Sequence, residues 1–274
     1  MDIFGQAVVM GIVQGLTEFL PVSSSGHLII VPFLFGWTDP FITSLAFSVM
    51  LHIGTLAALL VYFRADWIRL VPAGFATIRD RSFRADPDRR LAWLLVVATI
   101  PAAIAGFLLS DVIETAFRDI GWVAVTLVLG AVILWLADRW GARTKGVEDV
   151  TFPVAAGIGT AQALALIPGF SRSGISISAA RFAGLDREAA ARFSFLMATP
   201  VTAGAALFEV RKLIAGETGL DVPIGPLLAG MTAAFIAGMI AIGFLLRYLR
   251  TRSLTIFVIY RLVLAAVVVV AWLR

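Results

Sequence analysis

Two interruptions in an otherwise apolar chain constrain its fold more than any other feature. Two apolar stretches, residues 3–37 and 152–184, are broken in the middle by Pro, Gly and Ser, around Pro21 and around Pro168-Gly169. Elsewhere, runs of about 18 to 23 residues that are free of internal charge, apart from Glu209 near one end and Arg261, have the length that a helix needs to cross a bilayer. These runs are residues 41–63, 91–110, 121–138, 193–210, 226–247 and 254–273.

Backbone that is broken at membrane depth leaves N–H and C=O groups without partners. It is tolerated only where it is buried in protein or lines a water-filled cavity. We therefore expect each broken stretch to form a re-entrant hairpin that enters and leaves on the same side. The composition, with 60% hydrophobic and 15% charged residues, is typical of an integral membrane protein. The predicted fold is one all-α membrane domain, residues 1–274, with six transmembrane helices and two re-entrant helical hairpins.

The chain also divides into two similar halves, residues 1–140 and 150–274, each with one hairpin followed by three spans. An odd number of spans inverts the second half relative to the first, so we expect an inverted-topology repeat. Such repeats place their binding site near the midplane, where broken helices meet. At a constant offset, matching residues recur in the two halves: Gln14 with Gln162, Ser23 with Ser171, Ser25 with Ser173, and Gly26 with Gly174.

The basic residues indicate an orientation rather than a nucleic-acid partner. Of the 22 Lys and Arg residues, 16 fall in segments 64–90, 139–150, 181–192 and 247–253. The positive-inside rule makes these segments cytoplasmic and both termini periplasmic. The Arg-rich loop 64–90 is then a topology signal. No Lys or Arg precedes Arg64, so we expect no signal peptide. The absence of Cys excludes thiolate chemistry.

The first break carries residues suited to anion chemistry. Glu18 follows Gln14 by four residues and shares its helical face, and an ionisable group at this depth normally faces a cavity and has a partner. After Pro21 come Ser23, Ser24, Ser25, Gly26 and His27. The start of a new helix, with free N–H groups and added hydroxyls, is suited to binding an anion. The alternatives are a hydrated or structurally paired Glu18 and simple helix capping by one serine.

The second break repeats this pattern and adds a guanidinium group. Its residues are Gly169, Phe170, Ser171, Arg172, Ser173 and Gly174. Arg172 presents a planar fork that matches phosphate or carboxylate oxygens, although it could instead serve only as an ion-pair partner of Glu18. If the two breaks meet, a base, nucleophile candidates and an anion clamp share one pocket, as phosphoryl or acyl transfer requires. For His52 we favour a structural role.

The runs Q-G-L-T-E-F-L-P-V-S-S-S-G-H, residues 14–27, and P-G-F-S-R-S-G, residues 168–174, resemble the bacterial undecaprenyl-diphosphate phosphatases, also called bacitracin-resistance proteins. The resemblance covers the whole chain. The family pattern begins with Glu or Gln, so Gln14 is an allowed variant that leaves Glu18 as the single carboxylate. This puts in doubt any mechanism that needs two carboxylates.

The resemblance implies that the terminal phosphate is removed from the C55 isoprenoid diphosphate, which recycles the lipid carrier of cell-wall synthesis and confers bacitracin resistance. It also implies a site that opens to the periplasmic side of the bacterial inner membrane, a divalent cation such as Mg²⁺ or Ca²⁺ held by Glu18, and a possible homodimer. Ser24 or His27 would be the nucleophile. The catalytic residues would be Glu18, Ser24, His27 and Arg172, and the substrate contacts Gln14, Ser23, Ser25, Gly26, Gly169, Ser171, Ser173 and Gly174.

Two other functions share some of these features. A lipid or anion transporter would also use an inverted repeat with broken helices, but binding alone does not require both Glu18 and His27. A second superfamily of membrane phosphatases has a similar P-S-G-H motif, together with a later histidine. Because no histidine follows His52 in this chain, we reject that reading.

Overall fold

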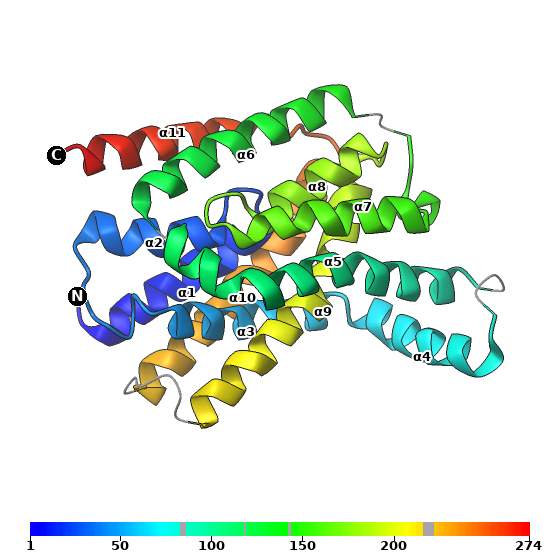
Figure 1. Ribbon diagram of the computed structural model, residues 1–274, viewed down its shortest axis with the longest axis horizontal. Helices are drawn as coiled ribbons and strands as arrows, with labels where there is room; N and C mark the ends of the chain where they lie inside the picture. Colours follow the sequence, from blue (N-terminus) through cyan, green and yellow to red (C-terminus); the bar gives the residue numbers. More distant parts are fainter. Residues whose placement is uncertain (83–85, 118, 142–143, 216–221) are drawn as a thin grey trace.

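The computed structural model describes residues 1–82, 86–117, 119–141, 144–215 and 222–274 (Figure 1). These residues form helices joined by short connections. The helices are α1 (Ile3–Phe19), α2 (Ser24–Phe35), α3 (Leu45–Tyr62), α4 (Arg64–Asp80), α5 (Pro87–Ala116), α6 (Ile120–Trp140), α7 (Phe152–Gln162), α8 (Arg172–Phe182), α9 (Arg187–Ile214), α10 (Ile224–Leu249) and α11 (Thr255–Trp272), with short 3₁₀ helices η1 (Val147–Asp149) and η2 (Ala163–Leu166).

Six helices of the described residues are long and apolar enough to cross a membrane, and they coincide with the six predicted spans. Their apolar segments are Leu45–Tyr62, Pro87–Leu109, Ile120–Trp140, Arg187–Phe208, Ile224–Leu249 and Thr255–Trp272. The prediction of an all-α, multi-pass membrane protein is therefore confirmed. The first interrupted stretch forms α1 and α2, and the second forms α7, η2 and α8. In both stretches the helix breaks at the proline that the sequence indicated.

The segment predicted as an Arg-rich loop, residues 64–90, contains a helix over most of its length. Helix α4 follows α3 after Phe63 alone. Its ion pairs explain why a segment rich in arginine can be helical and packed: Asp66 accepts from Arg192 of α9 at 2.7 Å, and Arg69 donates to Asp88 of α5 at 2.8 Å. The hairpin of α4 and α5 extends to one end of the molecule (Figure 1).

The two halves of the chain interleave. Helix α1 packs chiefly against α10 of the other half, and α7 packs against α5. Small residues allow the first of these approaches, because a Cβ atom on Gly15 would lie 2.5 Å from the carbonyl oxygen of Ala234. Close backbone contact between small residues is the usual way for helices to associate in a membrane, where the hydrophobic effect does not drive them together. The inverted orientation of the halves remains a prediction.

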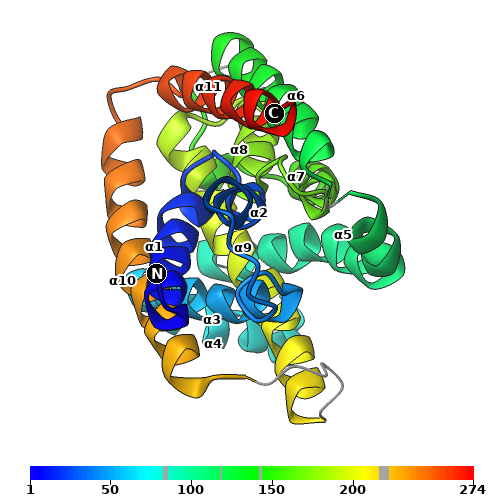
Figure 2. The ribbon, with the colours of Figure 1, turned by 90° about the vertical axis from the view of Figure 1, so that its left-hand side faces the viewer.

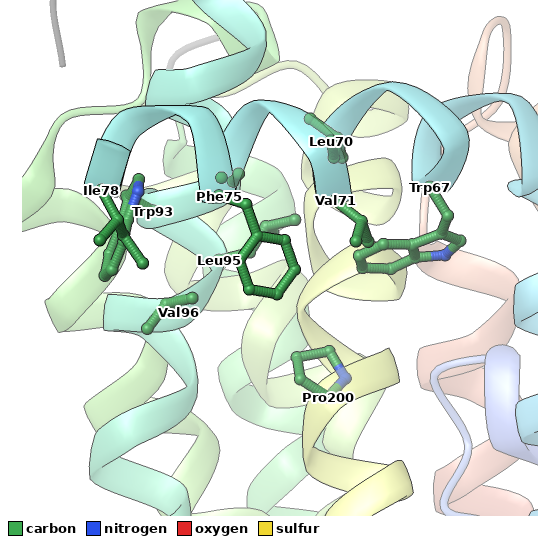
Figure 3. Close-up of a pocket in the computed structure, with 11 residues that line it drawn as sticks. Trp67, Leu70, Val71, Phe75, Ile78, Trp93, Leu95, Val96 and Pro200 are labelled. Carbon is green, nitrogen blue, oxygen red and sulfur yellow. The ribbon is translucent and has the colours of Figure 1, made fainter. Parts of the chain in front are cut away.

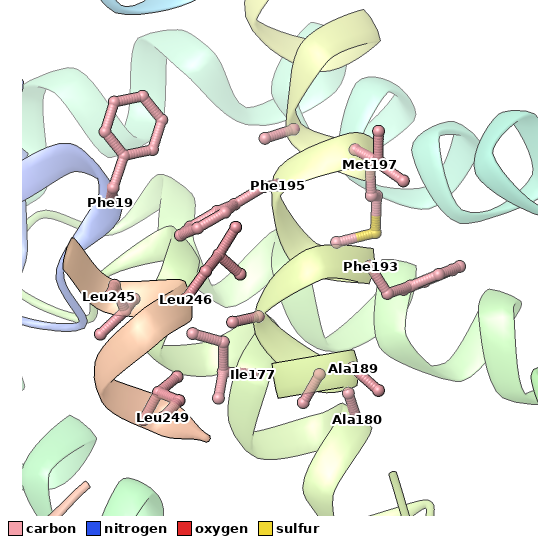
Figure 4. Close-up of a cluster of buried hydrophobic side chains, with 14 of the residues drawn as sticks. Phe19, Ile177, Ala180, Ala189, Phe193, Phe195, Met197, Leu245, Leu246 and Leu249 are labelled. Carbon is pink, nitrogen blue, oxygen red and sulfur yellow. The ribbon is translucent and has the colours of Figure 1, made fainter. Parts of the chain in front are cut away.

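The largest buried apolar cluster of the described residues extends through most of the helices, and beside the first break it includes side chains of α1, α8, α9 and α10 (Figure 4). Phe19, which is fully buried, packs edge-on against Phe195 of α9 with ring centroids 5.4 Å apart. Ile177 of α8 and Leu245 of α10 belong to the same cluster. Because Phe19 is the last residue of α1, this packing fixes the end of that helix and the carboxylate that precedes it.

Helices α6 and α11 lie side by side over the two breaks (Figures 1 and 2). Helix α6 contacts α8 and α2, and α11 contacts α2. The polar backbone of each break is thus enclosed between long apolar helices. This is the environment in which broken backbone at membrane depth is tolerated.

Candidate active site

The two breaks have the same local geometry. Ser23 and Ser171 are the N-cap residues of α2 and α8, and both have a positive φ, 77° and 73°. Each hydroxyl accepts from the N–H three residues later, at Gly26 (3.2 Å) and Gly174 (3.1 Å). A non-glycine residue in such a conformation costs about 1–3 kcal/mol and persists only where its surroundings hold it, often at functional sites. One serine of each break is therefore a cap.

The breaks lie against each other. Ser173 Oγ of the second break donates to the carbonyl oxygen of Leu20 in the first at 3.1 Å. A Cβ atom on Gly26 would lie 3.5 Å from the Cα of Gly169. Gly169 has φ 97°, which favours glycine, and a Cβ atom there would collide with Thr126 of α6. The predicted meeting of the two breaks is thus present in the structure.

Arg261 of α11 joins the two breaks to α6. It is fully buried, and its guanidinium donates only to backbone carbonyls among the described residues. The acceptors are Pro21 (3.3 Å) in the first break, Gly169 (2.9 Å) and Phe170 (3.0 Å) in the second, and Thr126 (3.3 Å) and Leu127 (3.1 Å) in α6. Its five N–H donors match this number of acceptors. Arg261 therefore satisfies the carbonyls that the broken helices leave free.

Glu18 stands at the centre of the polar cluster and is buried. Its Oε1 accepts from Arg172 Nη2 at 2.5 Å, which links the first break to the second. Its Oε2 accepts from the hydroxyl of Ser24 and, at 3.1 Å, from the amide of Gln14. A carboxylate, a hydroxyl and a guanidinium from two distant segments thus form one connected site.

His52 of α3 completes this cluster. Its Nδ1 lies 2.7 Å from the carbonyl oxygen of Ser48, which can only accept, so Nδ1 carries a hydrogen. Its Nε2 lies 3.5 Å from Oε2 of Glu18. The Nε2 side of the ring therefore faces the central carboxylate. The structural role that the sequence favoured for His52 stays a prediction, and the ring lies beside the central carboxylate.

His27 has different partners. Its Nδ1 donates to the carbonyl oxygen of Ser23 at 2.7 Å, and its Nε2 accepts from the hydroxyl of Tyr260 at 2.7 Å. The two rings are stacked, with centroids 5.7 Å apart. Both nitrogens of His27 are therefore engaged away from Glu18. A nucleophilic nitrogen needs a free lone pair, so this geometry favours Ser24 over His27 as the nucleophile.

The other predicted residues lie around the same two breaks. Ser25 lies 3.4 Å from Ser23, and Ser171 lies 3.2 Å from Ser173, oxygen to oxygen. Sequence reasoning assigned no site role to His52, Arg261 or Tyr260. A signal was present for two of them, since His52 and Arg261 are ionisable residues inside otherwise apolar spans. Tyr260 carries no such signal.

The oxygen atoms at Glu18 and Gln14 suit a cation that is bound together with the substrate phosphates. They do not form a complete metal site on their own. Among the described residues, no group of three His, Asp or Glu side chains could hold a metal ion. The Oε1 atom of Gln14 is buried and has no hydrogen-bond partner in the described part of the chain. Mg²⁺ is usually bound through one or two protein oxygens together with substrate phosphates and water. Glu18 and the free Gln14 oxygen fit that requirement.

Comparison with known proteins identifies the family of this chain. The family described as "Bacitracin resistance protein BacA" matches residues 7–267. The undecaprenyl-diphosphatase of Desulforudis audaxviator is 47% identical over 270 residues, which cover 98% of each chain. Those of Gemmatimonas aurantiaca and Moorella thermoacetica are 46% and 47% identical, over 96% and 98% of each chain. A profile match and full-length relatives at this identity assign the family: the chain belongs to the bacitracin resistance protein BacA family.

Proposed function

We propose that this protein removes the terminal phosphate of undecaprenyl diphosphate and releases undecaprenyl phosphate. The observation that carries the proposal is the linkage of Arg172, Glu18 and Ser24 across the two breaks. A hydroxyl bonded to a buried carboxylate is an activated nucleophile. A guanidinium beside it is a clamp for the phosphate that the nucleophile attacks. The names of the full-length relatives support the same reaction.

The first step uses Ser24 as nucleophile. Its oxygen attacks the terminal phosphorus, the bond from that phosphorus to the bridging oxygen breaks, and undecaprenyl phosphate leaves with the electron pair. The hydroxyl proton passes to Oε2 of Glu18, which already accepts it as a hydrogen bond. Glu18 then passes this proton to the oxygen of the leaving phosphate and is a carboxylate again. In the second step Glu18 accepts a proton from water, whose oxygen attacks the phosphorus of the phosphoserine, and the bond from that phosphorus to Ser24 Oγ breaks. Inorganic phosphate leaves, and Ser24 regains its proton.

Charge neutralisation supplies most of the catalysis in phosphoryl transfer. Arg172 is positioned to exchange its bond with Glu18 for bonds to phosphate oxygens. Helices α2 and α8 both begin at the breaks, so the positive ends of their dipoles add to the charge that attracts the phosphate. A divalent cation, Mg²⁺ or Ca²⁺, held by Glu18 and the Gln14 oxygen would neutralise further phosphate charge.

The biological setting belongs to the same proposal. Recycling of undecaprenyl phosphate would supply the lipid carrier of cell-wall synthesis and would reduce sensitivity to bacitracin, which traps the diphosphate. The distribution of Lys and Arg supports a site that opens to the periplasmic side of the inner membrane, with both termini periplasmic. A lipid or anion transporter is the competing function. Binding alone gives no reason for a serine hydroxyl bonded to a buried carboxylate.

Removal of divalent cations is expected to abolish phosphate release. The experiment measures inorganic phosphate from undecaprenyl diphosphate in nanodiscs, with Mg²⁺, with EDTA, and with EDTA followed by excess Mg²⁺. EDTA should stop release and Mg²⁺ should restore it, because the diphosphate brings several negative charges beside the Glu18 carboxylate, and Arg172 offsets only part of them. Full activity in EDTA would contradict the role of the metal.

Glu18→Ala is expected to lower the turnover number by about 10²–10⁴-fold, the usual contribution of a general base. Glu148→Ala is the matched control, since Glu148 is exposed and lies outside the site. If wild-type protein binds the lipid but releases no phosphate under any of these conditions, the transporter function is favoured instead.

His52→Ala is expected to lower turnover by about 10–100-fold, the usual cost of losing a side chain that orients a catalytic group. His52→Gln keeps a donor that can reach Glu18, so it should retain more turnover than His52→Ala. The measurement is kcat and KM for each variant in the same nanodiscs. Equal losses in the two variants would contradict the idea that a donor from His52 to Glu18 supports turnover.

A further inference from the structure

Helix α4 has an apolar face that other helices of the described residues leave open. Ile68, Val71, Phe75 and Ile78 recur every three or four residues, and 50–72% of their surface is exposed. The opposite face carries the ion pair of Asp66 with Arg192. An amphipathic helix of this kind lies at a membrane boundary, with its apolar face toward lipid.

A groove lies beneath this face, between α4, α5 and α9 (Figure 3). Its volume is about 280 Å³. Side chains of α4, including Trp67 and Phe75, point toward Val96 of α5 and Pro200 of α9 (Figure 3). The lining is apolar except for the indole nitrogens, and Trp67 Nε1 is buried with no hydrogen-bond partner in the described residues. The groove is thus shaped and lined for a hydrocarbon chain.

An exposed apolar track connects the groove to the second break. Val96 lines the groove, and Ile100, Ile104 and Phe107 follow it at intervals of four, four and three residues on one face of α5. At a rise of 1.5 Å per residue the track is about 16 Å long. It ends beside Gly106, which lies against Leu166 of η2, two residues before the proline of the second break. One exposed face of α5 therefore runs from the depth of the second break to the groove.

We propose that this groove holds the far part of the polyprenyl chain of the substrate whose diphosphate lies between the two breaks. This inference rests on the proposed function. One leaflet contributes about 15 Å of hydrocarbon, half of the bilayer core. An undecaprenyl chain is longer than that, so a chain that starts at middle depth must continue along the protein or fold back into lipid. The α5 track and the groove give the part of the chain beyond the second break an apolar path along the protein.

If the groove binds the far part of the chain, it should affect only substrates whose isoprenoid chain is long enough to reach it. Farnesyl diphosphate presents the same headgroup on a much shorter isoprenoid chain, which ends before the groove. Apolar groups gain little by leaving lipid for an apolar protein surface, since only packing distinguishes the two. The groove should therefore have a modest effect, confined to long chains.

The proposal can be tested with substitutions that fill the groove with a larger side chain. Gly74 and Ala92 both line it where α4 meets α5, since a Cβ atom on Gly74 would lie 3.5 Å from that of Ala92, an ordinary contact. Gly74→Leu and Ala92→Leu place a larger side chain there. Gly225→Leu is the matched control, because a Cβ atom at Gly225 would meet no atom within 4 Å. Each variant is assayed for kcat/KM with undecaprenyl and farnesyl diphosphate in nanodiscs.

We expect both groove variants to lower kcat/KM for undecaprenyl diphosphate by about three- to tenfold, a loss of roughly 0.7–1.4 kcal/mol of packing. Farnesyl diphosphate should be unaffected, and Gly225→Leu should change neither substrate. An equal loss with both substrates would overturn the proposal, because the groove would then be structural or hold bulk phospholipid. Unchanged kinetics with undecaprenyl diphosphate would overturn it as well.

A second measurement is independent of catalysis. Undecaprenyl phosphate with a photoreactive diazirine at the far end of its chain is bound to the wild-type protein and irradiated, and the labelled peptides are identified. The proposal predicts label in the peptides of α4 and α5 that line the groove, and less of it in Gly74→Leu. Label spread evenly over the lipid-facing helices would overturn it. If no phosphate is released from either diphosphate but the groove is labelled, the proposed function fails and the chain site stands.

Discussion

Arg172→Ala is expected to lower phosphate release from undecaprenyl diphosphate by about 10³-fold, in the range for an arginine that neutralises charge in phosphoryl transfer. The protein should stay folded, because Arg172 bonds through its side chain only to Glu18 in the described structure. Glu18 retains Ser24, Gln14 and His52 as partners in the variant. The loss should appear in single-turnover phosphate release.

Arg172→Lys is the informative companion to this variant. It keeps the positive charge and loses the planar fork, so it should recover part of the activity. Thermal unfolding in detergent should place both variants within a few degrees of wild type. Near wild-type turnover in folded Arg172→Ala would mean that the second break does not bind the phosphate, and the proposed site would be wrong.

Arg261→Met is expected to destabilise the protein by at least about 3 kcal/mol. The change removes donors from five carbonyls, and Pro21, Gly169 and Phe170 belong to breaks where no helical N–H replaces them. Each buried acceptor that loses its partner costs about 1–3 kcal/mol. Because Arg261 holds the breaks together, activity should fall along with stability.

The measurement is the unfolding temperature and the yield of monodisperse protein. Arg261→Lys should fall between wild type and Arg261→Met, since an ammonium offers three donors where the guanidinium offers five. Arg252→Met is the surface control, because Arg252 is exposed and its replacement should change stability by no more than about 0.5 kcal/mol. Wild-type stability of Arg261→Met would contradict the clamp role.

Much of the fold was predictable because the membrane imposes simple rules on sequence. A run of about 20 apolar residues without charge has little choice but to become a spanning helix. A proline followed by serines and glycine must end one helix and begin another. The positions of Pro21 and Pro168 therefore located both breaks.

The site was predictable in part, for a related reason. Polar groups are costly at membrane depth, so Glu18 and Arg172 stand out as residues with a function. Helix α4 was missed because its apolar face alternates with arginines, and counting charges concealed its period. Tyr260 was missed because a tyrosine in a span gives no distinctive signal.

By itself, the sequence determined which six segments cross the membrane, where two further apolar stretches break, and which polar residues lie at the breaks. These are local properties, set by hydropathy and by backbone chemistry within about 20 residues. Only the tertiary structure decided the partners: Glu18 with Arg172, 154 positions later, His52 with Glu18, and Arg261 with both breaks. Such pairings depend on how helices distant in sequence pack, and interleaved halves bring together side chains that no local pattern relates.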